Sequence, residues 1–239
     1  MKKKLFLKFF SPDFFLKFAD RIVVVLIFPC LIFIFYGTVY GLFFVPSDFQ
    51  QKDAFRIIYV HVPSAYMSIL IYVFIGMMSI IYILSNMELF DFIAYSSAKI
   101  GSIFTLIALI TGSIWGKPMW GTWWIWDARL TSELILLFLY FGYLGLRNAL
   151  ANRHIASNSC AVLSLIGLIN VPIIHYSVEW WYTLHQRSTL SRLGKPSIDL
   201  EMLYPLISMC VGFFLFYFLI LIMSVKNEIL LKKSEKMLL

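Results

Sequence analysis

Five of the seven tryptophans in this chain fall within the run WGKPMWGTWWIWD, from Trp115 to Asp127. Single tryptophans commonly anchor a helix end at the lipid–water boundary, but five together exceed what anchoring requires. Glycine and proline interrupt the run, so we expect it to depart from a regular spanning helix. These features predict a broad, rigid aromatic surface with polar edges, which suits a large planar ligand. The residues of this surface are Trp115, Gly116, Pro118, Trp120, Gly121, Trp123, Trp124, Trp126 and Asp127.

Three of the four histidines are further candidates, because imidazole nitrogen is the commonest metal ligand among side chains. His61 stands in YVHVPSAY, His175 in NVPIIHYSVEWW and His185 in EWWYTLHQRS, whereas His154 is interpreted as a solvated loop residue. A bare zinc or copper ion would more usually recruit a carboxylate, a thiolate or a third close histidine, and no such cluster stands at short spacing. The three cysteines are isolated within apolar runs and form no CxxC motif.

The composition assigns these residues to a membrane protein. Hydrophobic residues make up 61% of the 239 positions and charged residues only 14%, far outside the soluble globular range. The net charge of +7 comes from basic residues that crowd the chain ends, which indicates a lipid bilayer rather than nucleic acid as partner. No phosphate-binding loop is visible, so any nucleotide hydrolysis must be performed by a partner.

Six apolar stretches are long enough to cross a bilayer, since a span needs about twenty helical residues. They cover about 22–45, 62–84, 100–116, 130–149, 155–178 and 202–225. We therefore predict an all-α polytopic membrane protein with six transmembrane helices in a single domain, 1–239. Glu133 would be a buried ionisable residue of the fourth helix, and Asp127 could either pair with Arg129 or cap that helix.

The distribution of Lys and Arg predicts the orientation of these helices. With six spans both termini share one side, and the terminal segments with the loops on that side hold thirteen of the twenty Lys and Arg residues. Both termini are therefore expected in the cytoplasm. The loops 46–61, 116–130 and 179–201 then lie on the outer face, and they bring the tryptophan run to the same face as His61, His175 and His185.

Haem is the ligand that this combination favours, because its iron takes imidazole ligands, its ring packs on aromatic surfaces and its propionates pair with cations. Two histidines from different loops could supply both axial ligands, but the residues alone do not rank His185 over His175. Candidate propionate contacts are Arg56, Lys117, Arg129, Arg187 and Arg192. Further candidates near the site are His175, Glu179, Trp180 and Trp181.

The stretch WGKPMWGTWWIWDARLTSELILLFLY resembles the tryptophan-rich WWD signature of haem-handling proteins in cytochrome c maturation. RIIYVHVPSAY and NVPIIHYSVEWWYTLHQ further resemble one branch of these proteins, the CcmC family, over about residues 37–225. In that family the axial ligands are the histidines of the H-V-P and T-L-H-Q segments, here His61 and His185. The tryptophan run would then form the haem platform and the docking surface for a haem chaperone, CcmE.

The resemblance implies a delivery protein of the bacterial inner membrane rather than an enzyme. It would bind haem b transiently, as cargo, on the periplasmic face and present it to CcmE for covalent attachment. The expected partners are the ABC transporter subunits CcmA and CcmB and the small protein CcmD. Two other functions stay open: a membrane b-type cytochrome that carries electrons, and a small-solute transporter that binds a cationic substrate in an aromatic cage.

Overall fold

The computed structural model describes residues 11–186 and 198–238, and every regular element in these ranges is a helix. The α-helices are α2 (Pro12–Phe43), α3 (Ile58–Ser85), α4 (Glu88–Trp120), α5 (Ala128–Ala149), α6 (Arg153–Gly167), α7 (Asn170–Trp180) and α8 (Leu200–Leu238); a 3-10 helix, η1 (Asp53–Ile57), precedes α3. With α6 and α7 taken as one segment, six are long and apolar enough to cross a membrane. The predicted all-α fold with six spans is confirmed.

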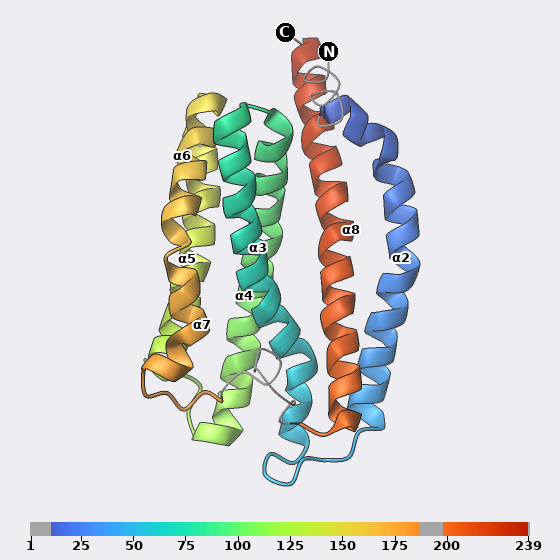
Figure 1. The fold of residues 1–239 in the computed structure, drawn as a ribbon, viewed down its shortest axis with the longest axis vertical. Helices are drawn as coiled ribbons and strands as arrows, with labels where there is room; N and C mark the ends of the chain where they lie inside the picture. Colours follow the sequence, from blue (N-terminus) through green and yellow to red (C-terminus); the bar gives the residue numbers. More distant parts are fainter. Residues whose placement is uncertain (1–10, 187–197, 239) are drawn as a thin grey trace.

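Helices α3 to α7 form one bundle, and α8 packs between this bundle and α2 (Figure 1). Ion pairs join α2 and α8, from Lys226 to Asp20 and from Lys233 to Asp13. The beginning of α2 and the end of α8 therefore lie at the same end of the molecule, as six spans require. The assignment of this end to the cytoplasm stays a prediction from charge.

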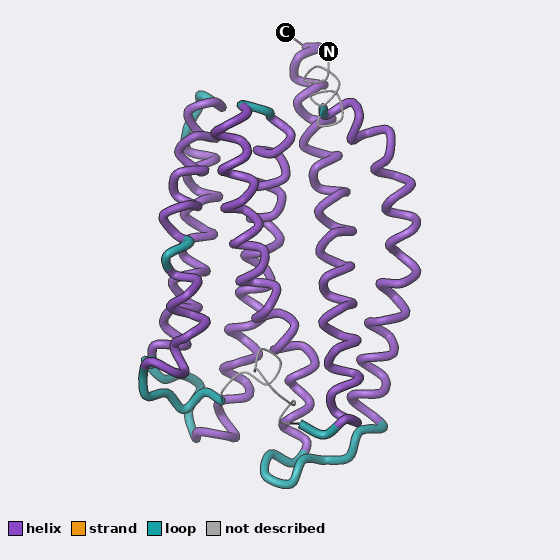
Figure 2. The backbone as a smooth tube through the Cα atoms, viewed as in Figure 1, coloured by secondary structure: helices purple, strands orange, loops and turns teal. Residues whose placement is uncertain are grey.

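The opposite end of the bundle gathers the connections that carry the candidate site (Figure 2). There the chain passes from α2 through η1 into α3, from α4 into α5, and out of α7. The described parts of the predicted outer loops, 46–61, 116–130 and 179–201, thus meet at one end. This arrangement brings His61, the tryptophan run and His185 together.

Several helices extend beyond the predicted spans, and two of these differences concern the site. Helix α3 already starts at Ile58, so His61 lies in its first turn rather than in the loop before it. Helix α4 continues through Gly116 and Pro118 to Trp120, so the first half of the tryptophan run is helical. A proline in the last turn removes only one backbone N–H donor, and its cost there is small.

The fifth span consists of two helices instead of one. Backbone N–H groups at Leu168 and Ile169 bond three residues back, at 3.3 and 3.2 Å, which tightens the chain between α6 and α7. Pro172 has no N–H to continue the α-helical pattern across this point. Beside this break, Asn170 donates from Nδ2 to the Ser132 carbonyl on α5 at 2.9 Å. Helix α7 is thereby fixed against α5, close to the site.

A buried ion pair fixes the other end of the bundle. Arg147 on α5 donates through both terminal nitrogens to the Asp91 carboxylate on α4, at 2.9 and 2.6 Å, and the two side chains are only 7% and 6% exposed. We expect Arg147→Ala to lower the free energy of unfolding by about 3–5 kcal/mol, because it leaves a buried charge without a partner. Thermal or denaturant unfolding in detergent measures this.

The exposed pair between Lys233 and Asp13, whose side chains are 46% and 75% exposed, is the matched control for that experiment. Lys233→Ala should cost less than about 1 kcal/mol, as exposed ion pairs usually do. The double variant Asp91→Asn, Arg147→Met should recover part of the loss, because no unpaired charge remains. Equal stability of Arg147→Ala and the wild type would contradict a contribution from the buried pair.

Candidate functional site

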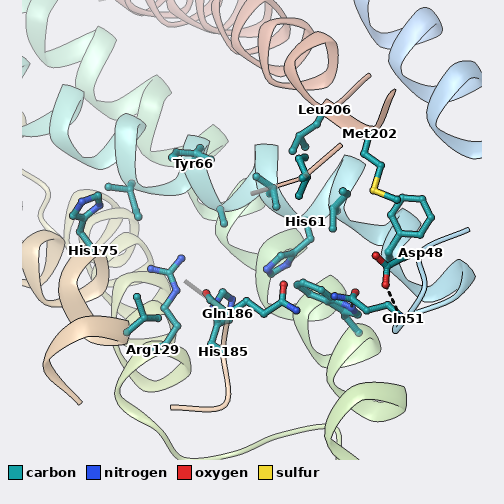
Figure 3. A pocket seen from close by; sticks show the side chains of 18 residues that line it. Asp48, Gln51, His61, Tyr66, Arg129, His175, His185, Gln186, Met202 and Leu206 are labelled. Atoms are coloured by element: carbon teal, nitrogen blue, oxygen red, sulfur yellow. Dashed lines mark hydrogen bonds between the residues drawn. The ribbon is translucent and has the colours of Figure 1, made fainter. Parts of the chain in front are cut away.

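His61 and His185, distant in the sequence, lie next to each other at the loop end of the bundle. Their ring centroids are 6.2 Å apart and their planes are inclined by 42°. His61 comes from α3 and is 8% exposed, whereas His185 comes from the segment that follows α7. Figure 3 shows both rings at one cavity, which Arg129 and His175 also line.

Hydrogen bonds determine which nitrogen of each ring is available. Nδ1 of His61 lies 3.1 Å from the Ala108 carbonyl of α4, and Nδ1 of His185 lies 2.7 Å from the Gln186 carbonyl. A carbonyl oxygen can only accept, so each Nδ1 carries the proton and donates it. Nε2 of both rings is then unprotonated and can bind a metal. A hydrogen bond from the opposite nitrogen commonly orients a metal-ligating histidine in this way.

The spacing of the two rings suits one metal ion between them. With a metal–nitrogen bond of about 2 Å on each side, two opposed imidazoles have ring centres about 6 Å apart. The ring separation of 6.2 Å in the structure matches this arrangement. Among residues 11–186 and 198–238, no group of three or more His, Cys, Asp or Glu side chains is placed to hold a metal ion. A two-histidine site leaves the four equatorial positions to another ligand, as haem iron requires.

The protonation state of His185 also favours ligation. Burial and, second to it, the positive charge of nearby Arg129 lower the pKa of His185 from its ordinary value of 6.5 to about 4, against a smaller opposing effect of the Gln186 carbonyl. At pH 7 the ring is therefore neutral. Neutral imidazole is the form that offers a lone pair to iron.

The tryptophan run divides into residues that face the histidines and residues that face outward. The Trp115 ring is 5.8 Å from His61, and the Trp120 ring is 6.5 Å from His185. We call Trp115 and Trp120 the inner tryptophans. Trp123 and Trp126, the outer tryptophans, are 56% and 77% exposed. Trp124 lies between the two groups: its ring contacts Trp126, while its indole N–H is buried.

Two glycines explain how a helix end can present this surface. A Cβ on Gly116 would lie 2.9 Å from the Trp120 ring, so a residue without a side chain lets that ring fold back over the last turn of α4. Gly121 has φ of 77°, the left-handed conformation that favours glycine at the end of a helix. The chain then turns, and Trp124 lines a second cavity together with the inner tryptophans.

The predicted propionate contacts differ in their surroundings. Arg129 lines the cavity at the two histidines, while its Nη1 donates to the Ile174 carbonyl at 2.8 Å. Arg56 donates to the Gly41 and Val45 carbonyls, both at 2.8 Å. Lys117 is exposed and donates to the Gly121 carbonyl. Arg187 and Arg192 lie outside the described residues. Of the three described cations, Arg129 is the one placed at the cavity.

The remaining predicted residues lie around this centre. His175 lines the cavity from α7 and contacts the Tyr176 ring at 4.8 Å, on the far side of Arg129 from His61 in Figure 3. Glu179, Trp180 and Trp181 are exposed where α7 ends. Each can contact a ligand or partner at this end of the molecule, and their roles stay predictions.

Carboxylates and an amide complete the site. Asp127 is the N-cap of α5 and accepts from the Leu130 N–H at 2.8 Å, which confirms the cap proposed from the sequence. Glu133 is buried and accepts from the Ser68 hydroxyl at 2.6 Å. Gln51 was not identified from the sequence: its amide oxygen accepts from the Trp115 indole at 3.0 Å. A glutamine in a loop carries no pattern that would have indicated this contact.

Known proteins are similar to this chain over most of its length. Residues 5–239 match the model of a protein family described as heme exporter protein C, CcmC. The heme exporter protein C of Escherichia coli K12 is 48% identical over 200 residues, which cover 84% of this chain and 80% of that protein. That of Haemophilus influenzae is 42% identical over 87% of this chain and 85% of its own. A ccmC-like mitochondrial protein of cytochrome c biosynthesis from Marchantia polymorpha is 43% identical over 92% and 93%.

Proposed function

Because this chain belongs to the heme exporter protein C family, we propose that it binds haem between His61 and His185 and presents it to a haem chaperone. The family assigns the chain to cytochrome c maturation, and its six apolar helices make it a multi-pass membrane protein. The finer proposal places the site on the periplasmic face of the bacterial inner membrane. The chaperone is CcmE, and the chain works in a complex with CcmA, CcmB and CcmD.

The pairing of the His61 and His185 rings, each with its Nδ1 bonded to a carbonyl, carries this proposal. The rings come from separate parts of the chain, stand at a separation that suits two axial ligands and have their Nδ1 atoms bonded to carbonyls. Haem b, which has no covalent link to its protein, is the proposed cargo. The iron lies between the rings, and Arg129 is the cation best placed to meet a propionate.

The exposed tryptophans support delivery over permanent storage. Trp123 and Trp126 present exposed apolar surface on either side of Trp124, which lines a cavity with both histidines, and a partner can dock on this surface. The proposed role of the chain is to hold and orient haem while the chaperone attaches it covalently; nucleotide hydrolysis belongs to the transporter subunits. This is delivery rather than catalysis by the chain itself.

A resident cytochrome b is the main competing function, and the burial of His61 inside α3 favours it more than a loop position would. Exchange of haem distinguishes the two. We expect protein purified from haem-replete cells to show a bis-imidazole visible spectrum, and to lose most of its haem when purified apo-chaperone is added. Haem that stays with the membrane protein in the presence of excess chaperone would favour the cytochrome. A chaperone variant that lacks its haem-attaching histidine is the control.

A further inference from the structure

His185 lies outside any helix, so other contacts must hold its ring in place. Helix α7 ends at Trp180, and the segment 181–186 that follows has no regular structure. A metal ligand on such a segment loses affinity unless neighbouring groups fix it. In the part of the chain that the structure describes, a hydrogen bond from Thr183 to Asp127 joins this segment to the start of α5.

Asp127 uses its two carboxylate oxygens for different purposes. Oδ1 accepts from the Leu130 backbone N–H at 2.8 Å and caps α5. Oδ2 accepts from the Thr183 hydroxyl. The carboxylate is itself held at a helix N-terminus, where the helix dipole favours negative charge. Asp127 is therefore a fixed point on a membrane-spanning helix.

Thr183 connects Asp127 to His185 through two hydrogen bonds. Its hydroxyl oxygen donates its proton to Asp127 and accepts from the His185 backbone N–H at 3.1 Å. Hydrogen bonds to a charged acceptor are short and strong, and consecutive bonds reinforce one another. The chain of contacts runs from α5 through the carboxylate and the hydroxyl to the backbone of the histidine.

We infer that Asp127 is a positioning residue for His185: through Thr183 it holds the second axial ligand at the iron. The acidic residue at the end of the tryptophan run then acts on the ligand, not on the haem ring or the docking partner. This inference rests on the proposed ligation of haem by His185. It assigns to Thr183 a role that its sequence context does not suggest.

Substitutions that separate the two tasks of Asp127 test this inference. Thr183→Val keeps the shape of the side chain and the cap of α5 but removes the hydroxyl. Thr183→Ser keeps the hydroxyl and is the matched control. Asp127→Ser keeps an N-capping oxygen, since serine caps well, but offers no second oxygen to Thr183. All three are made in the full-length protein and loaded with haem.

We expect Thr183→Val and Asp127→Ser to lose haem about 10 to 100 times faster than wild type, the usual effect of removing the partner that orients a metal ligand. Their spectra should shift from six-coordinate toward five-coordinate haem, and added free imidazole should restore the six-coordinate form. Thr183→Ser should behave as wild type. The double variant should be no worse than either single variant, because both changes break one chain of contacts.

Four other results would contradict the inference or the proposed function on which it rests. Wild-type spectra and dissociation rates in Thr183→Val would overturn the inference. So would an Asp127→Ser protein that keeps its spectrum but fails to transfer haem, because that result makes Asp127 a docking residue. If free imidazole does not restore the six-coordinate spectrum, Asp127 and Thr183 act only in folding, which would also overturn the inference. Wild-type protein without bis-imidazole haem would instead refute the proposed function itself.

Discussion

We expect His61→Ala and His185→Ala each to abolish the bis-imidazole spectrum and to weaken haem binding by more than about 100-fold, and we expect His175→Ala to retain both. This loss of affinity is large because each variant lacks an iron ligand. Removing a partner that only orients a metal ligand already lowers the affinity by about 10- to 100-fold. The His175 variant should keep its spectrum and affinity because the His175 ring lies against Tyr176, away from the pair formed by His61 and His185. Visible spectra and haem titration of the purified variants measure both effects.

Free imidazole separates the loss of a ligand from the loss of the fold in this experiment. In either alanine variant, imidazole can enter the space of the missing ring and restore a six-coordinate spectrum if the rest of the site is intact. His61 is buried against α4, so its removal also leaves a cavity, and rescue there should need more imidazole than in His185→Ala. A bis-imidazole spectrum that survives both substitutions would refute the axial assignment, and its loss in His175→Ala would make His175 a ligand.

The six-span fold was predictable because it depends on local composition. Each span is a long apolar run, and the bilayer imposes the length that it must reach. The end of α4 was not predictable in the same way, because Gly116 and Pro118 usually indicate a break. Here Gly116 accommodates the Trp120 ring and Pro118 lies close enough to the helix end to cost little. The helix therefore continues into the tryptophan run.

The candidate site was predictable only in its residue types. The sequence identifies histidines, tryptophans and cations on one face, but no local pattern distinguishes His185 from His175, and that choice came from the resemblance. Nor does it indicate that Arg56 donates to carbonyls at and just after the end of α2, or that Thr183 bonds Asp127. Such contacts join residues distant in the chain, so they depend on how the helices pack.

Alanine substitutions of the inner and the outer tryptophans are expected to impair different steps, haem binding and haem transfer. Trp115→Ala and Trp120→Ala should weaken haem binding by roughly 10-fold, because each ring packs on one of the two histidines and aromatic pairs contribute about 0.5–1.5 kcal/mol beyond burial. Trp115→Phe, which keeps a ring but loses the bond to Gln51, should lie between alanine and wild type. Haem titration measures the affinities.

Trp123→Ala and Trp126→Ala should instead keep haem and slow its transfer to the chaperone by about 30-fold, the effect of removing an interface tryptophan worth about 2 kcal/mol. Phe49→Ala removes another aromatic ring, 88% exposed at the same end of the molecule, and should leave transfer unchanged. Stopped-flow transfer from preloaded protein measures these rates. If the outer variants lose haem as the inner ones do, the run is one haem platform; if transfer stays at the wild-type rate, the chaperone docks elsewhere. Slow transfer from fully loaded protein would mean that the run combines two surfaces, one for the cargo and one for its recipient.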